Sequence, residues 1–193
     1  MVKADKEDRN LVVAVLSDSF KNNLSVNFIV QQDEQKDKRI RALMEYSFDM
    51  CSLFGDVFLS DDKKSCALIL YPHLKKTTLL AIWLDIKLIF KAVGIGGISK
   101  ALQREAQIKH IQPKEEMLYL WFIGVDPFLQ HKGIGSKLMD DVIQLSKIKN
   151  LPLFLETSTV ENLPWYKRFG FETYNKLELG YTLYFLKRNW DTK

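Results

Sequence analysis

The stretch that decides the fold runs from Met117 to Lys149 and reads MLYLWFIGVDPFLQHKGIGSKLMDDVIQLSKIK. Its first part, 117–125, is an apolar run with the length of a strand that is covered on both faces. The pair Asp126-Pro127 ends that strand, because proline has no backbone N–H to donate. From Ile134 onward, apolar residues recur every three or four positions, which predicts a helix. A glycine-bearing turn therefore links a buried strand to the start of a helix.

Such a turn has a well-known physical use. The first turn of a helix has unpaired N–H groups and the positive end of the helix dipole, so it attracts anions and above all phosphate. Gly133 and Gly135 lack a Cβ, so the backbone can approach a ligand closely, and Lys132 and Lys137 add positive charge. Many strand-to-helix turns contain glycine and bind nothing, so this short pattern alone leaves both interpretations open.

A longer pattern surrounds these glycines. Gln130-x-x-Gly133-x-Gly135, placed directly after the strand, resembles the acetyl-CoA signature of the GNAT superfamily of N-acetyltransferases. Downstream, the segment 155–157 followed by Asn162, Tyr166 and Gly170-Phe171 resembles the last strand–helix–strand unit of that family. The resemblance covers 117 to about 185, and more loosely it extends to bacterial members that acetylate drugs and toxins.

The resemblance implies an α/β (α+β) fold with a mixed, mostly antiparallel central sheet flanked by helices, formed by one domain over residues 1–193. The sequence patterns agree with it. They predict helices over 11–20, ended by Asn22-Asn23, and over 40–51, with a hairpin of 57–59 and 66–71. They also predict a strand over 153–157, a short helix over 162–169, and a terminal hairpin of 171–177 and 181–186.

The segment 78–111 is predicted to be a helical insertion before the central strand. It is apolar, but Asp85, Lys87 and Lys91 would each cost about 2.5–3.5 kcal/mol in the middle of a bilayer, which argues against a membrane span. Two interpretations, which can hold together, remain: a helix packed on the domain, and a wall or lid of the acceptor pocket carrying Trp83 and Phe90. The glycines of 94–97 predict a break between helices rather than a nucleotide loop.

Composition limits the partners. The chain has 193 residues, 47% apolar and 27% charged, with a net charge of +4, which is too small to predict nucleic acid binding. Two cysteines, Cys51 and Cys66, predict a reducing cytoplasm rather than a disulfide framework. The three histidines are scattered without ligand spacing, so no metal is expected. We expect no membrane partner, and a monomer or a homodimer.

The family resemblance implies acetyl-CoA as the acyl donor and assigns residues to it. The loop and the helix start would hold the pyrophosphate: Gln130, His131, Lys132, Gly133, Ile134, Gly135 and Ser136. The main chain of the central strand, at Phe122, Ile123, Gly124 and Val125, would pair with the pantetheine arm, and Asn162 would bond that arm. For Gly124 a packing role is the alternative, and for Asn162 a helix N-cap.

Acyl transfer also needs an acid and a base. Tyr166 matches the family's tyrosine general acid, with a merely packed tyrosine as the alternative. Several members carry a glutamate where this chain has Tyr119, so the base is less clear; Glu156 on the next strand is the best-placed carboxylate, and a chain of waters is the alternative. The predicted function is an N-acetyltransferase that acts on a primary amine of a small molecule by direct attack. The alternatives are acetylation of a protein N-terminus or lysine, and a non-catalytic acyl-CoA-binding regulatory module.

Overall fold

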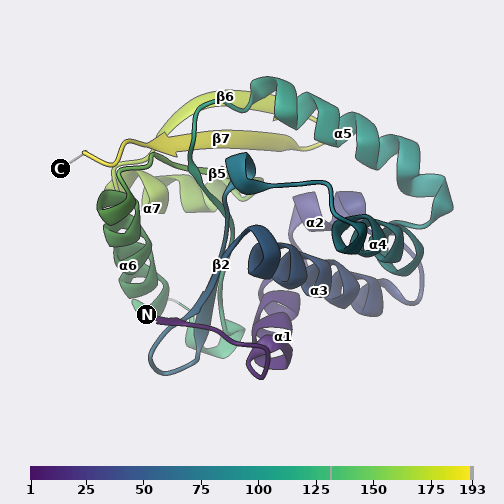
Figure 1. The fold of residues 1–193 in the computed structure, drawn as a ribbon, viewed down its shortest axis with the longest axis horizontal. Coiled ribbons are helices and arrows are strands. Elements are labelled where there is room, and N and C mark those ends of the chain that lie inside the picture. The colour runs from purple at the N-terminus through teal and green to yellow at the C-terminus, as the bar shows by residue number, and fades with distance from the viewer. Residues whose placement is uncertain (131, 192–193) are drawn as a thin grey trace.

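The computed structural model describes residues 1–130 and 132–191, which are built around one seven-stranded sheet (Figure 1). The strands stand in the order β1 (Val2–Lys3), β2 (Gly55–Leu59), β3 (Ser65–Leu70), β4 (Leu118–Val125), β5 (Leu153–Thr157), β7 (Thr182–Arg188) and β6 (Glu172–Glu178). All neighbours are antiparallel except β4 and β5, which are parallel. The predicted mixed, mostly antiparallel sheet is thereby confirmed.

Helices cover both faces of this sheet. One face carries α1 (Arg9–Phe20), α2 (Leu24–Ile29), α3 (Lys36–Phe54), α4 (Leu79–Leu88) and α5 (Ile98–Ile111). The other face carries α6 (Ile134–Lys149) and α7 (Leu163–Arg168). Because both faces are covered, every residue of β3 is buried. The predicted strand–helix–strand unit β4–α6–β5 lies in the middle of the sheet, as expected.

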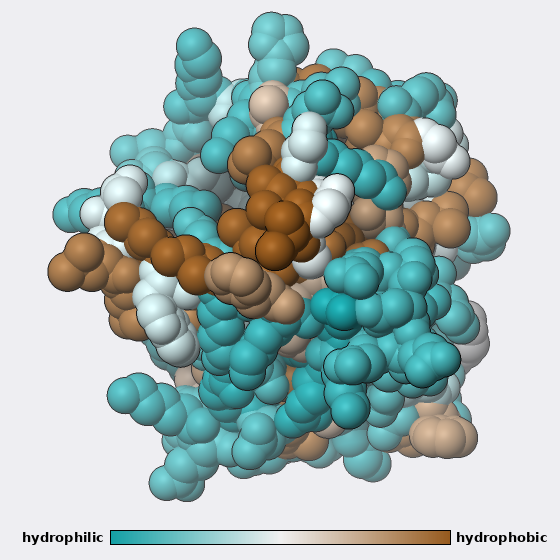
Figure 2. Space-filling view, turned by 90° about the vertical axis from the view of Figure 1, so that its right-hand side faces the viewer, coloured by the Kyte–Doolittle hydropathy of each residue, from teal (hydrophilic) through white to brown (hydrophobic). Residues whose placement is uncertain are grey.

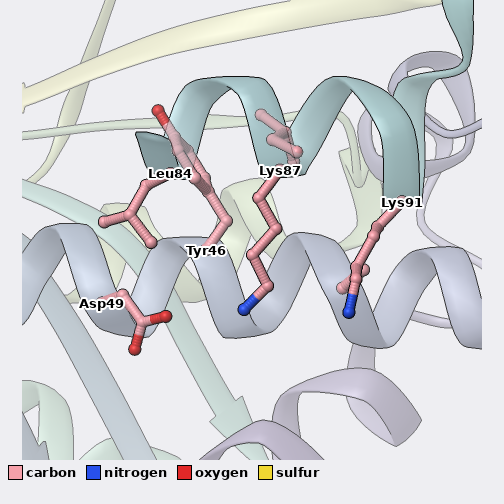
Figure 3. Close-up of a pocket in the computed structure, with 7 residues that line it drawn as sticks. Tyr46, Asp49, Leu84, Lys87 and Lys91 are labelled. Atoms are coloured by element: carbon pink, nitrogen blue, oxygen red, sulfur yellow. The ribbon is translucent and has the colours of Figure 1, made fainter. Parts of the chain in front are cut away.

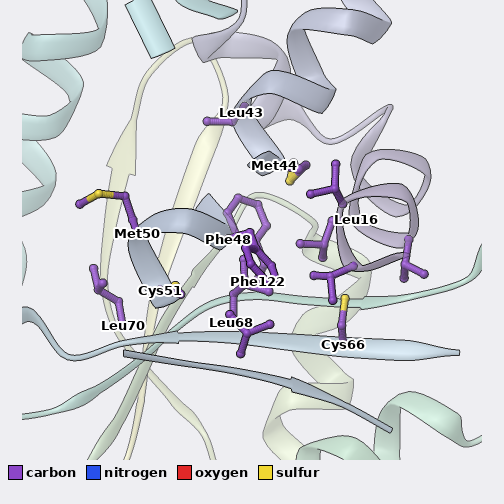
Figure 4. Packing of buried hydrophobic residues seen from close by; sticks show 14 of the residues in the cluster. Leu16, Leu43, Met44, Phe48, Met50, Cys51, Cys66, Leu68, Leu70 and Phe122 are labelled. Atoms are coloured by element: carbon purple, nitrogen blue, oxygen red, sulfur yellow. The ribbon is translucent and has the colours of Figure 1, made fainter. Parts of the chain in front are cut away.

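The larger part of the core lies between the sheet and α1 and α3. On α3, apolar residues recur every three or four positions, which turns one side of the helix toward the sheet. Figure 4 shows Met44, Phe48 and Cys51 of α3 gathered with Leu16 of α1 and Leu68 of β3. A second cluster joins α6 and α7 to the opposite face of β4 and β5. The central strands are therefore fixed from both sides.

The insertion is helical, as predicted. α4 continues as a π-helical turn over Ile89–Val93, and Gly94, with a φ of +73°, ends it before the 3-10 turn Ile95–Gly97 and α5. Ala81 and Leu84 bury α4 against α3, whereas Trp83 is 55% exposed and Phe90 66% exposed. The packing of α4 on the domain therefore rests on Ala81 and Leu84, and a role of Trp83 and Phe90 in the acceptor pocket stays a prediction. Among the described residues, no helix has the length and apolar character needed to cross a membrane.

The short helix α2 was not predicted. It has only one buried residue, Val26, so no periodic apolar pattern announces it. Asn23, predicted from the sequence to end the first helix, accepts a hydrogen bond from the backbone N–H of Val26 and so caps α2. The same residue type signals both the end of one helix and the start of the next.

Candidate active site

The sheet opens between β4 and β5. The two strands pair only at Leu118 with Leu153 and at Tyr119 with Phe154. Beyond these positions β4 continues to Val125 and pairs with β3 alone, while β5 pairs with β7 alone. The last part of β4 therefore presents main-chain groups without a strand partner on the β5 side. Buried backbone N–H and C=O groups need partners, so this opening suits an extended ligand with amide groups of its own.

A bulge in β4 lies at the start of this opening. Leu68 of β3 stands opposite Phe122, but Ile69 stands opposite Leu120, which leaves Trp121 as an extra residue on β4. Trp121 and Phe122 consequently both pack with the α1 and α3 side, and their ring centroids lie 5.7 Å apart. The alternation of side chains is reversed from this point, so Ile123 packs on the α6 side. The bulge bends β4 away from β5 where the predicted binding strand begins.

The first turn of α6 lies next to the end of β4. Gly133 is the N-cap of the helix, with a φ of +82°, and a Cβ built on it would meet nothing within 4 Å. A Cβ on Gly135 would lie 3.2 Å from the Val125 Cγ2 atom, so that glycine permits close packing of helix and strand. Ser136 Oγ accepts a hydrogen bond from Trp165 Nε1 at 3.1 Å, which leaves its own proton free to donate. Lys132 is exposed beside them and Ile134 is partly buried, while His131 lies outside the described residues.

Two of the strand residues predicted to bind the pantetheine arm already make contacts within the protein. The Val125 carbonyl accepts hydrogen bonds from Ser19 Oγ at 2.7 Å and from Gln130 Nε2 at 3.3 Å, so this oxygen is engaged within the protein. A Cβ on Gly124 would lie 2.9 Å from Leu16 Cδ2, so packing against α1 accounts for this glycine by itself. The free main-chain groups of the opening therefore centre on 122–124.

The predicted acid and the predicted asparagine follow β5. Tyr166 of α7 is buried in the cluster on the α6 side, with Trp165 and Phe171 against its ring. Among the described residues its hydroxyl has no hydrogen-bond partner, and burial raises its pKa, so the phenol stays protonated. Asn162 occupies the N-cap position of α7, but its side chain makes no capping bond and is exposed. The capping alternative for Asn162 is not realised in this structure.

Glu156 lies on the opposite face of the sheet, within a small polar cluster. Its carboxylate accepts hydrogen bonds from Tyr119 OH on β4 and from Gln112 Nε2, at the end of α5, at 2.9 Å in the second case. Burial raises the pKa of Glu156, although both hydrogen bonds and the positive charge of Arg104 act in the other direction. The pKa of Tyr119 is raised by burial and by the Glu156 charge. Glu156 and Tyr119 thus span the opening where the two strands begin to part.

Arg104 is the residue of this region that sequence reasoning missed. From α5 it donates to Ser25 Oγ of α2 at 2.6 Å and to the Tyr181 hydroxyl, in the turn between β6 and β7, at 3.2 Å. Phe28 of α2 also packs edge-on against Tyr181, with ring centroids 5.3 Å apart. The three elements are thereby tied together over the Glu156 side of the opening. No local pattern reveals such a bridge, because its members are 77 and 79 residues apart from Arg104 in the sequence.

Two hollows lie away from this opening. The space between α3 and α4 is about 10 Å³, no larger than one water needs. Figure 3 shows Lys87 of α4 and Lys91 of the π-helical turn reaching across it toward α3. A shallow cleft of about 390 Å³ lies between α2 and 93–100, with Lys100 Nζ 3.7 Å from the Phe28 ring centroid. Among residues 1–130 and 132–191, no three or more histidine, cysteine, aspartate or glutamate side chains are grouped as metal ligands.

Part of the chain matches a known protein family. Residues 87–173 match the acetyltransferase (GNAT) domain model. An uncharacterized N-acetyltransferase of Schizosaccharomyces pombe is 38% identical over 53 residues, which are 28% of this chain and 22% of that protein. The matched part thus spans about a fifth of this curated relative.

Solved structures share the fold over the whole chain. A protein described as histone acetyltransferase HPA2 and related acetyltransferase, from Corynebacterium glutamicum, superposes with a TM-score of 0.68 at 17% identity, over 97% of this chain and 94% of that one. Arylalkylamine N-acetyltransferase 2 from Aedes aegypti gives a TM-score of 0.66 at 13% identity, over 98% of each chain.

The sheet that opens beside a glycine-bearing helix start is thus shared with solved acetyltransferases. The acetyltransferase (GNAT) domain match over residues 87–173, together with the fold shared with solved acetyltransferases, confirms the resemblance to the GNAT superfamily seen in the sequence.

Proposed function

We propose that this protein transfers the acetyl group of acetyl-CoA to a primary amine of a small molecule. The observation that carries the proposal is the opening between β4 and β5, which begins after two paired positions and leads directly to the first turn of α6. An extended, amide-containing arm fits between the strands, and a pyrophosphate fits the helix start. The cradle at Gly133 supports this placement, because its missing side chain leaves open space on the outer side of the turn.

The residues around the opening have separate proposed roles in binding acetyl-CoA. The N–H groups of the first turn of α6, together with the Ser136 hydroxyl, hold the pyrophosphate. The main chain of 122–124 pairs with the pantetheine arm and fixes the thioester, and Asn162 bonds that arm from the other side of the opening. Such placement converts a bimolecular reaction into an effectively unimolecular one. Acetyl-CoA supplies the activated acetyl group.

Acid and base stand on the two faces of the sheet. Glu156 takes a proton from the ammonium form of the acceptor, so that the neutral amine attacks the thioester carbonyl and a nitrogen–carbon bond forms. The carbon–sulfur bond breaks, Tyr166 gives its proton to the departing thiolate, and the proton that the new amide nitrogen releases restores the Tyr166 hydroxyl. The separation supports direct attack, because Tyr166 packs on the α6 side while Glu156 joins the polar cluster under α5.

The acceptor is proposed to be small and cationic. Arg104 ties α2 to α5 and to the β6–β7 turn on the Glu156 side of the opening, and we infer that this bridge limits the room there for an extended peptide. The Glu156 carboxylate offers a negative charge to an ammonium group. The Aedes aegypti neighbour is named for arylalkylamines, which are acceptors of this kind. The free, buried thiols of Cys51 and Cys66 support the reducing cytoplasm as the proposed location.

The test is an assay of thiol release with acetyl-CoA and a panel of amines, in parallel with calorimetric titration of acetyl-CoA and CoA. We expect binding of both nucleotides, and turnover with at least one small primary amine. Binding without turnover on small amines, amino-terminal peptides and lysine peptides would favour the non-catalytic acyl-CoA-binding module instead. No binding of either nucleotide would refute the proposal.

A further inference from the structure

The helix α4 carries an apolar ridge on its solvent face. Leu79, Trp83 and Ile86 of α4, and Phe90 of the π-helical turn that continues it, follow one another at intervals of three or four residues along one side. They are 88%, 55%, 47% and 66% exposed. Figure 2 shows apolar side chains gathered on the side of the molecule that carries α4, above a lower half that is mostly hydrophilic. We call these four residues the α4 ridge.

The fold does not require this ridge. Ala81 and Leu84 already bury the opposite side of α4, and Ala92 and Val93 anchor the turn that follows. A surface helix normally turns polar residues outward, whereas the α4 ridge is apolar over about 16 Å of helix length. A contiguous exposed apolar patch on a folded protein marks an interaction surface.

Lysines surround the ridge. Residues 73–95 contain four lysines and one aspartate, a net charge of +3. Lys75 and Lys76 precede α4 and Lys91 follows Phe90; among the described residues, none of these three has an ion-pair partner. Lys87 Nζ lies 4.0 Å from Glu45 Oε2 and 5.2 Å from the Trp83 ring centroid.

The one acidic residue in segment 73–95 is Asp85, and its carboxylate is turned away from the α4 ridge. Asp85 accepts a hydrogen bond from Tyr46 OH of α3 at 2.7 Å, which directs its charge toward α3 and away from the α4 ridge. The α4 ridge therefore presents apolar side chains beside the exposed lysines at positions 75 and 76, whereas Lys87 is paired with Glu45 of α3.

We propose that the α4 ridge docks on an anionic lipid surface. Apolar side chains from a helix that lies along the surface enter the boundary between headgroups and acyl chains, while the lysines at its edge meet lipid phosphates. A second copy of the chain fits less well, because pairing two ridges would bring two sets of lysines together without acidic partners. This contact lies in the plane of the membrane surface, so it differs from the membrane span that the lysines argue against. It is independent of the acetyl transfer proposed above.

The experiment is sedimentation of the purified protein with vesicles. We expect binding to vesicles of phosphatidylcholine mixed with phosphatidylglycerol, weaker binding to phosphatidylcholine alone, and weakening by salt. The triple variant Leu79→Ser, Trp83→Ser, Phe90→Ser should partition roughly tenfold less, since three large apolar side chains no longer enter the interface. Lys75→Glu with Lys76→Glu should abolish the preference for phosphatidylglycerol.

The matched control is Ile148→Ser on α6, which removes an apolar residue that is 78% exposed but outside the ridge; it should bind vesicles like the original protein. Circular dichroism and acetyl-CoA titration check that each variant is folded. Equal partitioning of the triple variant and the original protein, or no binding by the original protein, would overturn the proposal. So would a dimer in sedimentation velocity that the triple variant dissociates, because the ridge would then belong to a second copy. Quenching of tryptophan fluorescence by brominated lipid, lost in Trp83→Phe, tests the same contact without the triple variant.

Discussion

At the scale of single residues, the Tyr166 hydroxyl is the group on which the proposed chemistry depends most. Burial raises its pKa, so it remains protonated throughout the pH range of an assay and can serve as a proton donor. Tyr166→Phe keeps the ring that packs against Trp165 and Phe171 and removes only the hydroxyl. We expect turnover to fall by about 10²–10⁴-fold, the usual contribution of a general acid, with unchanged acetyl-CoA affinity.

Steady-state kinetics and calorimetry on the same preparation check this. An unchanged turnover would show that Tyr166 is only a packed residue, and a loss of acetyl-CoA binding would show that the substitution disturbed the donor site. Trp165→Phe is an informative companion, because it removes the bond to Ser136 Oγ and should weaken acetyl-CoA binding without removing the acid.

The raised pKa of Glu156 predicts how the reaction rate depends on pH. Its carboxyl pKa is raised above the usual 4.5 by burial, so the proposed base is lost as the pH falls through that higher value. The rate should therefore decline toward acid pH, and Glu156→Gln should remove both most of the activity and this pH dependence. The pH profile of kcat/KM for the two proteins checks the assignment; a profile that keeps its acid limb in the variant would exclude Glu156 as the base.

The same pKa shift affects stability. A carboxyl whose pKa is raised by folding binds its proton more tightly in the folded state, so its contribution to stability is present below 4.5 and is lost as the pH rises through the folded pKa. Between pH 4.5 and the folded pKa, we expect the melting temperature of the original protein to fall relative to that of Glu156→Gln. Above the folded pKa, the difference between the two melting temperatures should stay constant. Thermal melts of both proteins from acid to neutral pH measure it. A difference that does not change with pH would contradict the raised pKa.

At the scale of elements, the turn into α6 offers a matched pair of glycines. Gly133 and Gly180 both have a φ of +82°, and a Cβ on either would meet nothing within 4 Å. Alanine at either position should therefore cost a similar free energy of unfolding, about 1–2 kcal/mol for the left-handed conformation. Only Gly133→Ala should weaken acetyl-CoA binding, since its Cβ would enter the space proposed for the pyrophosphate. Denaturant unfolding and calorimetry separate the two effects; equal acetyl-CoA affinity of the two variants would place the pyrophosphate elsewhere.

At the scale of the whole molecule, the sequence predicts helices and strands that neighbouring residues define, but not contacts between distant segments. The strand 153–157, the helix from Ile134 and the terminal hairpin are set by apolar periodicity and turn residues, so they could be predicted within a few residues. The bulge at Trp121 could not, because an extra residue in β4 is defined only by its register against β3. The bridge made by Arg104 could not either, because it depends on how three distant elements pack.

The Arg104 bridge affects both the stability of the molecule and the pKa of Glu156. Arg104 joins α5 to α2 and to the β6–β7 turn, and its positive charge lowers the pKa of Glu156. Arg104→Met should leave two partly buried hydroxyls, of Ser25 and Tyr181, without their donor and reduce stability by about 1–3 kcal/mol. Because the charge is also lost, the pKa of Glu156 should rise, and the acid limb of the pH–rate profile should move to higher pH.

Ser25→Ala separates the two consequences, since it removes one bond of the bridge and keeps the guanidinium charge. It should lower stability by a smaller amount, raise KM for the amine acceptor, and leave the acid limb where it is. If the bridge closes the acceptor side as proposed, both variants should also accept bulkier amines or short peptides that the original protein rejects. Identical acceptor ranges in all three proteins would mean that α2 and the β6–β7 turn do not limit the acceptor, and the choice between a small amine and a peptide would then rest on the charge of Glu156 alone.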